Sequence, residues 1–222
     1  MTEPGAWSPP RRERAWSGAA GREPRYSIDE ILDAALELVV EDGPAAATVS
    51  AVARRIGAPS GSVYHRFASR DELMARLWLR SIARYQEGVV TALRRNDANE
   101  AARAAVAHCF DWTAAHPGES ALLLQYNKRD LLRAWPDTLA AELRTHNRRT
   151  REVVRGYARQ RFGSSDAEVM DRVTFALVDL PYAAVRRHLP DRGRPAEWLR
   201  DFTLRSAEAI LAEVPTRITD SS

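Results

Sequence analysis

The sequence contains few of the residues that build disulfides, metal sites or membrane anchors. Its 222 residues include a single cysteine, Cys109, which excludes an intrachain disulfide and a zinc site built from cysteines. The apolar stretch around Cys109 predicts a buried, unreactive thiol. No run of about 18 apolar residues occurs, so no membrane-spanning helix is predicted. The N-terminus is rich in Pro, Gly and Arg and lacks the apolar core of a signal peptide. We therefore expect a cytoplasmic protein.

Lysine is almost missing as well. Of the 33 basic residues, all are arginine except Lys128, a bias more typical of a GC-rich genome than of a function. The formal net charge of +3 does not by itself indicate a nucleic-acid binder. The hydrophobic fraction of 45% is ordinary and is sufficient for a buried core. The distribution of the charges is therefore more informative than their total.

Catalytic signatures are also lacking. The segment Pro59-Ser60-Gly61-Ser62 does not have the G-x-S-x-G spacing of an esterase nucleophile. There is no phosphate-binding loop, no dinucleotide fingerprint and no cluster of metal ligands. His108 and His116 share a helix face with Trp112, but no acidic or thiolate partner is evident, so a polar patch is favoured over a metal site. We predict no enzymatic activity and no cofactor.

The chain reads as an all-α protein of about nine helices, because apolar residues recur at spacings of three and four and no strand alternation occurs. Three S-x-x-E pairs predict capping boxes that open helices: Ser27 with Glu30, Ser69 with Glu72, and Ser165 with Glu168. Gly43-Pro44 ends the first helix, whose predicted apolar stripe is Ile28, Ile31, Leu32, Ala35, Leu38 and Val39. Pro181 predicts a kink in the helix after Ser165, and Pro190 with Gly193 predicts its end.

Residues 1–25 contain Pro, Gly and five arginines without an apolar pattern, which predicts a disordered basic arm. Such an arm can reach into a DNA groove, although a solvated tail fits residues 1–20 better. For Arg22 and Arg25, which lie next to the folded region, the two interpretations are equally good. The arm is followed by two predicted units, residues 26–73 and residues 74–218.

The most informative segment runs from Thr48 to Arg70. It predicts two short helices joined at Gly57, with Thr48 as the N-cap of the first and Val63 and Phe67 facing inward from the second. This arrangement is typical of a helix-turn-helix, whose second helix enters the DNA major groove. The segment holds four arginines and no acidic residue, and attraction to phosphates supplies most non-specific affinity for DNA.

At this point the sequence resembles the TetR family. The resemblance rests on Gly57, on Gly61-Ser62-Val63-Tyr64-His65-Arg66-Phe67 and on Ser69-Arg70-Asp71-Glu72-Leu73, and it is strong from about Tyr26 to Leu73. It implies that the chain is a DNA-binding transcriptional regulator. It also implies that residues 26–73 form the helix-turn-helix domain, and that residues 74–218 form a helical bundle for ligand sensing and dimerisation. Beyond Leu73 only the helical layout agrees.

The resemblance assigns DNA contacts residue by residue. Thr48 and Arg70 would bind phosphates, with the dipole of the following helix assisting Arg70. Ser50 matches a position that reaches a base in some relatives. Tyr64 and His65 would contact phosphates or thymine methyl groups, with a core tyrosine and a surface histidine as the alternatives. The residues expected to face base edges or the flanking backbone are Ser60, Gly61 and Ser62.

Aromatic side chains mark a candidate ligand pocket in the second unit. Helical bundles form apolar pockets lined by such residues, although each one taken singly is more typical of core. The candidate pocket residues are Trp78, Tyr85, Phe110, Trp112, Tyr126, Phe175 and Tyr182. The helix after Arg70 is the expected lever between pocket and DNA, because it joins the two units.

By resemblance, the last two helices would pair across a two-fold axis, with Leu177 and Phe202 in the expected interface. A stretch of six arginines between Arg148 and Arg161 is strongly basic. A solvated face is the simpler interpretation of this stretch, and a second site for DNA or an anionic ligand is the alternative.

The sequence therefore predicts a repressor that binds a palindromic DNA operator as a homodimer and is released by a small molecule. An activator is the alternative, because the chain does not reveal where its operator lies. The rival class is an all-helical ligand-binding or enzymatic protein that does not bind DNA. The acid-free segment from Thr48 to Arg70 favours the regulator.

Overall fold

The computed structural model describes residues 26–125, 137–192 and 195–213, and every regular element in these ranges is helical. The N-terminal elements are α1 (Ile28–Asp42), the 3₁₀ turn η1 (Pro44–Ala46), α2 (Val49–Arg55), α3 (Ser60–Tyr64) and α4 (Arg70–Leu93). The later elements are α5 (Ala98–Ala115), α6 (Pro117–Gln125), α8 (Asp137–Phe162), α9 (Ala167–Thr174), the π-helical turn η2 (Phe175–Asp179), α10 (Leu180–Arg192) and α11 (Glu197–Ala212). The all-α prediction is confirmed. The predicted basic arm, residues 1–25, lies outside the described residues.

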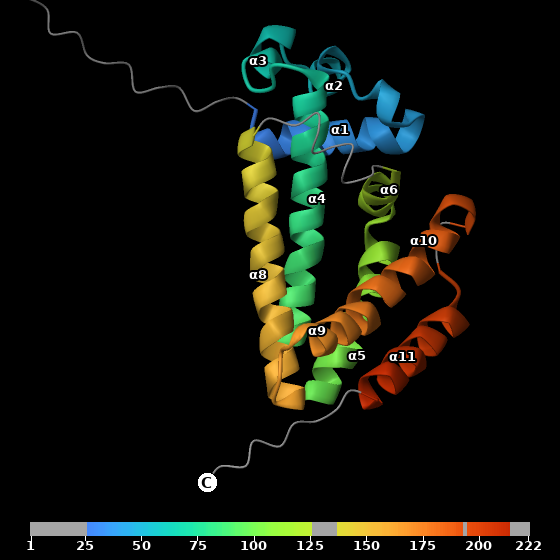
Figure 1. Ribbon diagram of the computed structural model, residues 1–222. Helices are drawn as coiled ribbons and strands as arrows, with labels where there is room; N and C mark the ends of the chain where they lie inside the picture. The colour runs from blue at the N-terminus through green and yellow to red at the C-terminus, as the bar shows by residue number, and fades with distance from the viewer. Residues whose placement is uncertain (1–25, 126–136, 193–194, 214–222) are drawn as a thin grey trace, which may run out of the picture.

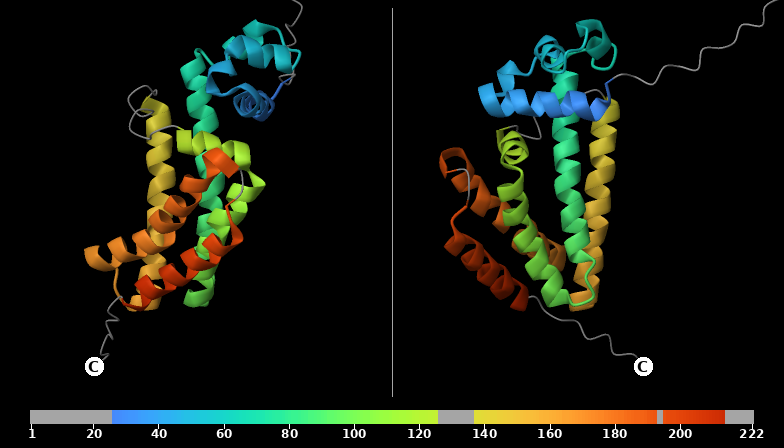
Figure 2. Two further views of the ribbon diagram at one scale, coloured as in Figure 1. Left: turned by 90° about the vertical axis from the view of Figure 1, so that its right-hand side faces the viewer. Right: turned by 180° about the vertical axis from the view of Figure 1, so that it is seen from behind.

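The helices α1 to α3 form a cap at one end of a bundle (Figure 1). The long helices α4 and α8 run side by side away from this cap. The helices α10 and α11 lie on the opposite side of α5 from α4 and α8, as the reverse view also shows (Figure 2). Because α4 begins within the cap and ends at the far end of the bundle, it connects both parts physically.

The buried residues form two clusters. One cluster surrounds Val52, Val63 and Phe67 in the cap and continues along α4 as far as Leu79. It also takes in Leu122 of α6 and two leucines of α8, so the cap and the adjoining end of the bundle share one core. The other cluster lies at the far end, around Phe110, Tyr157 and Leu177. Packing is therefore continuous across Leu73, the residue that ends the predicted DNA-binding unit.

The predicted helix starts are correct in part. Ser27 and Glu30 make the complete capping box, since each side chain accepts a hydrogen bond from the backbone of the other. At α4 the Ser69 hydroxyl accepts from the Glu72 amide. The Glu72 carboxylate accepts instead from the amide of Ala68, at 2.9 Å. Only half of that predicted box therefore forms.

The third predicted capping box is wrong. The N-cap of α9 is Asp166, whose carboxylate accepts from the amide of Val169 at 3.0 Å. The hydroxyl of Ser165 accepts from the guanidinium of Arg159. A carboxylate one residue further along offers a charged acceptor to the helix N-terminus, so it replaces the serine.

Two predictions about helix interiors need correction. The predicted buried stripe of α1 includes Ile28, but this residue is exposed, because it occupies the first helical turn. α10 continues through Pro190 to Arg192 instead of ending at that proline. The predicted irregularity near Pro181 is present as the π-helical turn η2, in which Leu180 donates to the carbonyl of Phe175. A proline ring clashes with the carbonyl four residues earlier, and the wider turn relieves that clash.

Candidate nucleic-acid interface

The turn between α2 and α3 is built as the sequence predicts. Thr48 caps α2 by accepting from the amide of Ala51 at 3.1 Å. Gly57 has φ of 66°, a left-handed conformation that favours glycine over residues with a side chain. The hydroxyl of Tyr26 donates to the carbonyl of Gly57 at 2.9 Å and so ties the turn to the start of α1. The sequence analysis missed the contribution of Tyr26.

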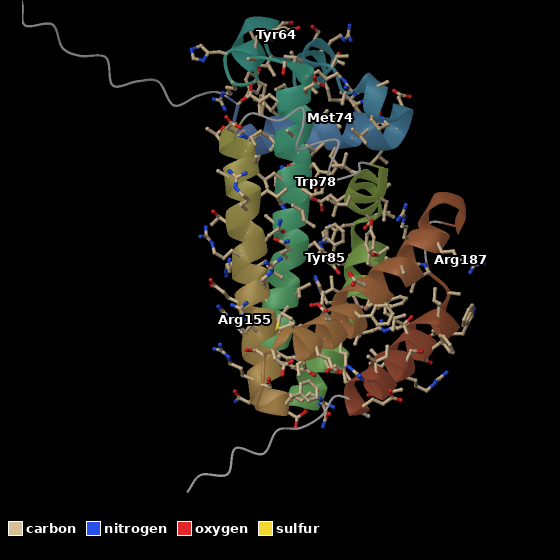
Figure 3. All side chains as sticks on the ribbon, viewed as in Figure 1. Tyr64, Met74, Trp78, Tyr85, Arg155 and Arg187 are labelled. Carbon is tan, nitrogen blue, oxygen red and sulfur yellow. The ribbon has the colours of Figure 1, made fainter. Side chains whose placement is uncertain are left out.

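One face of α3 is buried and the other is open. Val63 and Phe67 are almost fully buried against α1, α2 and α4. Tyr64 is 49% exposed and stands at the end of the molecule (Figure 3), which excludes the alternative of a core tyrosine. The other predicted contact residues of this segment are all exposed: Ser60, Gly61, Ser62 and His65. The structure therefore brings together the residues that the resemblance assigned to DNA.

The hydroxyl groups near the open face of α3 differ in whether their protons are still available for a hydrogen bond. Thr48 is exposed, and its hydroxyl oxygen acts only as the acceptor of the N-cap hydrogen bond of α2. Its proton therefore stays available for a phosphate oxygen. Ser62 donates its proton to the carbonyl of Pro59 at 2.6 Å. Ser50 is exposed on α2. Thr48 is therefore better prepared for a phosphate than Ser62 is for a base edge.

One arginine of the segment from Thr48 to Arg70 is held in ion pairs. Arg55 forms ion pairs with Glu37 at 3.1 Å and Glu41 at 2.5 Å, both from α1. Hydrogen bonds from Arg55 lower the pKa of the Glu41 carboxyl. The local charge of +4 expected from the sequence is thus partly neutralised, because the acids come from outside the segment. Arg54 is exposed, and none of the described ion pairs involves it.

Arg70 is held within the protein. Its guanidinium donates to the carbonyl of Pro44 at 2.6 Å and lies 3.8 Å from the carboxylate of Asp71. The side chain therefore ties the start of α4 to η1, and it remains partly exposed beside the open face of α3. A phosphate contact by Arg70 would have to use its remaining donors.

The predicted pocket residues separate into two groups. Trp78, Phe110 and Trp112 are buried and Tyr85 is partly buried, all on α4 and α5. Phe175 and Tyr182 lie at the surface instead, on η2 and α10. Tyr126 lies outside the described residues. Phe110 also lines a surface hollow of about 500 Å³ between α5 and the start of α11.

Tyr85 of α4, which is labelled in Figure 3, belongs to a row of aromatic and imidazole rings. Its ring centroid is 5.2 Å from those of His108 and Trp112, and that of Trp112 is 5.3 Å from His116. Nε2 of His108 lies 2.9 Å from the carbonyl of Tyr85. Burial lowers the pKa of His108 and raises that of the neighbouring Cys109 thiol to about 11. The predicted buried cysteine is confirmed.

A buried carboxylate escaped the sequence analysis. Glu119 of α6 is 3% exposed and accepts from the hydroxyl of Ser81 at 3.1 Å. It also pairs with Arg84 of α4 and with His116, each at 3.3 Å. The spacing of three residues between His116 and Glu119 was the available signal. Within the described ranges, no cluster of side chains could hold a metal ion. His108 contacts the carbonyl of Tyr85, and His116 contacts Glu119.

Ion pairs also join the cap to the bundle. Arg80 of α4 is largely buried and pairs with Asp29 at 3.2 Å and Asp33 at 2.7 Å, both on α1. Arg76, one turn earlier on α4, pairs with Glu142 of α8 at 2.9 Å. Gly118 of α6 packs so closely on α1 that a β-carbon there would lie 2.4 Å from Val40. α4 and α6 therefore both contact α1 directly.

The helices α10 and α11 carry exposed aromatic residues. Trp198 and Phe202, one turn apart on α11, are 63% and 55% exposed. Leu177, which the sequence analysis placed in a dimer interface, is buried within the core of its own chain. The prediction for Leu177 is therefore corrected, because this residue belongs to the core of its own chain. The large apolar residues exposed on η2, α10 and α11 are Phe175, Tyr182, Trp198 and Phe202.

Residues 31–77 match the model of the bacterial regulatory proteins of the tetR family. No curated protein matches the sequence. No helix in the described ranges is long and apolar enough to cross a membrane.

Solved structures with a similar fold cover most of both chains. PfmR, a TetR-family regulator from Thermus thermophilus, shares 20% identity over 83% of this chain and 98% of its own, with a TM-score of 0.62. FadR from Bacillus subtilis, solved in complex with stearoyl-CoA, shares 15% identity over 85% and 100%, with a TM-score of 0.61. A TetR-family regulator from Streptomyces coelicolor shares 24% identity over 84% and 96%, with a TM-score of 0.60. Residues 31–77 thus match the sequence pattern of the tetR family, and the chain has the fold of TetR-family transcriptional regulators.

Proposed function

We propose that this chain is a ligand-responsive transcriptional repressor that binds a palindromic operator as a homodimer and leaves it when a small molecule binds the bundle. The observation that carries the proposal is the open face of α3. There Gly61, Tyr64 and His65 are exposed while Val63 and Phe67 anchor the helix from behind.

The open face of α3 suits a major groove on both shape and charge. The groove is about 12 Å wide and admits one helix, and the first turn of α3 is slim because it consists of Ser60, Gly61 and Ser62. Tyr64 offers a ring for thymine methyl groups and a hydroxyl for a phosphate. No acidic residue lies between Thr48 and Arg70 to repel the DNA backbone.

A dimer is supported by the exposed aromatic surface of η2, α10 and α11. These elements are neighbours in the fold, and contiguous exposed apolar surface marks interaction sites on soluble proteins. Phe175 and Tyr182 supply such residues from one segment, and Trp198 and Phe202 supply them from α11. A two-fold axis through this surface would pair each α10–α11 unit with its copy and place two copies of α3 on one palindrome.

Release by a ligand is supported by the connections of α4 and α6. A ligand that tilts α4 would move Arg80 and, through its ion pairs, α1. A shift of α6 would act on the same two helices. Glu119 of α6 would act on α4 through its ion pair with Arg84, and Gly118 of α6 would act on α1 through its close packing. A ligand changes DNA affinity only by its differential affinity for the two states, typically about 1–3 kcal/mol.

The predicted effector is a small, largely apolar molecule. The aromatic row on α4 and α5 consists of apolar rings beside a few polar groups, which are the side-chain types that ligand sites share. The FadR neighbour was solved with stearoyl-CoA, which illustrates that this fold holds an acyl ligand in that protein.

The function is tested by electrophoretic mobility shift with the region upstream of the gene for this chain. The purified protein is expected to shift one palindromic fragment, and Tyr64→Ala with His65→Ala is expected to abolish the shift without unfolding the protein. Ligands that raise the melting temperature are then added to the complex, and some are expected to release the DNA. No shift on any upstream fragment at low salt would oppose the DNA-binding role. Stabilising ligands that never alter operator affinity would oppose the sensor role.

A further inference from the structure

Five arginines form a stripe along one side of α8, here called the arginine ridge: Arg144, Arg148, Arg151, Arg155 and Arg159. Their spacings of four, three, four and four residues keep them on one face of a helix. With a rise of 1.5 Å per residue, the ridge extends over about 22 Å. All five side chains are exposed, and the label of Arg155 marks the ridge in Figure 3.

The structure separates the ridge from the other arginines of this helix. Arg149 is bound to the carboxylate of Glu87 on α4, at 2.8 Å. Arg161 donates to the side chain of Asn99. The ridge arginines take part in none of the ion pairs of the described residues. The basic stretch seen in the sequence therefore contains two arginines that brace the fold and a set whose charge has no acidic partner.

The surroundings of the ridge compensate only a small part of its charge. Glu142 on the same helix is already paired with Arg76. Glu152 is the other acid between Thr138 and Gln160, and it stands beside the ridge without a described ion pair. Among the residues that the structure describes, the ridge arginines make two side-chain hydrogen bonds: Arg148 with Thr145 at 3.4 Å and Arg159 with Ser165 at 3.1 Å. Such a surface attracts a polyanion, because long-range attraction focuses where charges of one sign gather.

We propose that the arginine ridge is a second DNA-binding surface, which holds the phosphate backbone of a duplex independently of its sequence. Guanidinium groups bind phosphate oxygens through two parallel hydrogen bonds, and phosphate contacts alone give non-specific affinity. An anionic membrane fits less well, since surface-lying helices insert aromatic or large aliphatic residues beside their basic ones. The exposed positions of α8 between Thr138 and Gln160 carry no such residue.

The ridge does not serve the duplex that α3 would hold. α8 runs along α4, away from the end of the molecule where α2 and α3 lie (Figure 1). DNA lying across that end leaves the length of α8 uncovered. The ridge would therefore bind a second segment of DNA, which would allow one molecule to link two duplexes.

The test measures binding of a fluorescent duplex of random sequence by anisotropy, between about 50 and 200 mM salt. The background is the full chain with Gly61→Leu, which obstructs the open face of α3. The ridge variant adds R148Q, R151Q and R155Q, and the control adds R94Q, R95Q and R187Q, which removes three exposed charges elsewhere. Glutamine preserves helix propensity, so both variants are expected to fold.

The ridge variant is expected to bind about tenfold or more weakly at the lowest salt, with the slope of log affinity against log salt reduced by about 2–3. The control is expected to stay within about twofold of its background, because scattered charges do not align on one duplex. An equal loss in both variants, or no loss in the ridge variant, overturns the proposal. So does capture of the background protein by anionic lipid vesicles in preference to the duplex.

This outcome is separate from the function of α3. Because the ridge and control variants share one background and one random-sequence probe, their difference requires no operator. The proposal would survive a failure of operator binding, and operator binding would survive a failure of the ridge.

Discussion

Gly88 of α4 faces the imidazole of His108 so closely that a β-carbon at position 88 would lie 2.0 Å from Cε1 of the ring. Only a residue without a side chain permits this approach, so Gly88 sets the distance between α4 and α5 beside Tyr85. The same approach allows Nε2 of His108 to reach the carbonyl of Tyr85. Helix α4, which joins the two parts of the molecule, therefore packs closely on α5 at Gly88.

The first prediction concerns this approach. Gly88→Ala is expected to displace the His108 ring and lower the free energy of unfolding by about 1–3 kcal/mol, the usual cost of overpacking. In a His108→Ala background the ring is absent, and Gly88→Ala is expected to stabilise by up to about 1 kcal/mol through helix propensity. Urea denaturation of the four proteins measures both effects. A destabilisation that persists without the ring would show that something other than His108 sets the distance.

A second prediction follows from the lowered pKa of His108. Burial is the main cause of the shift, so the unfolded chain takes up a proton at a higher pH than the folded protein does. Stability contributed by neutral His108 is therefore fully present above its unfolded pKa of about 6.5. It is lost progressively as the pH falls below that value toward the lower pKa of the folded protein. His108→Gln keeps a donor for Tyr85 but does not titrate. Melting temperatures at pH 7.5 and 5.5 are expected to differ less in this variant, and an equal difference in both proteins would refute the assignment.

The dimer surface gives a third prediction. Phe202→Arg is expected to yield a folded monomer, because Phe202 is exposed in one chain and a charge there opposes apolar association. Leu177→Arg is expected to unfold the protein instead, since Leu177 is buried in its own core. Ile28→Arg, at an equally exposed apolar position on α1, serves as the control and should leave the mass unchanged. Light scattering with circular dichroism distinguishes these results, and a dimeric Phe202→Arg protein would contradict this surface.

Glu119 provides a fourth prediction. Its carboxylate contacts Ser81, Arg84 and His116, and Glu119→Gln would replace charge-assisted hydrogen bonds by weaker ones. We expect a loss of about 1–2 kcal/mol in the free energy of unfolding, toward the low end of the usual range because Arg84 is half exposed. Adding Ser81→Ala should cost less in the variant than in the parent, since the two side chains share one bond. Additive losses would mean that the carboxylate and the hydroxyl do not interact.

Local rules predicted the N-terminal domain well because its signals are close in sequence. The Ser27 capping box, the turn at Gly57 and the inward positions of Val63 and Phe67 all follow from spacings of a few residues. Contacts between distant segments could not be predicted in this way. The acids that neutralise Arg55 come from α1, and nothing in the segment from Thr48 to Arg70 indicates them.

Aromatic residues were the least predictable part of the second domain. Helical spacing shows that Phe175 and Tyr182 share a face, but not whether another helix of the same chain covers that face. The structure leaves both at the surface, while Trp112 on α5 is buried beside Tyr85. Composition alone does not distinguish pocket, core and subunit interface, because all three use the same side chains.

The central claim, that the open face of α3 enters the DNA groove, is tested most directly at Gly61. A β-carbon there would meet no atom within 4 Å, and the same is true of Gly156 on α8. Leucine at either position therefore adds bulk outside the protein without disturbing its core. The two variants form a matched pair that differs only in where the bulk lies.

The measurement is the affinity of both variants for the duplex that the wild-type protein selects from a random library. Gly61→Leu is expected to keep its melting temperature and to lose operator affinity by about 100-fold, equivalent to about 2.8 kcal/mol. Gly156→Leu is expected to bind as the wild type does. If Gly61→Leu binds the selected duplex as tightly as Gly156→Leu, the face of α3 does not enter the groove and the account is contradicted.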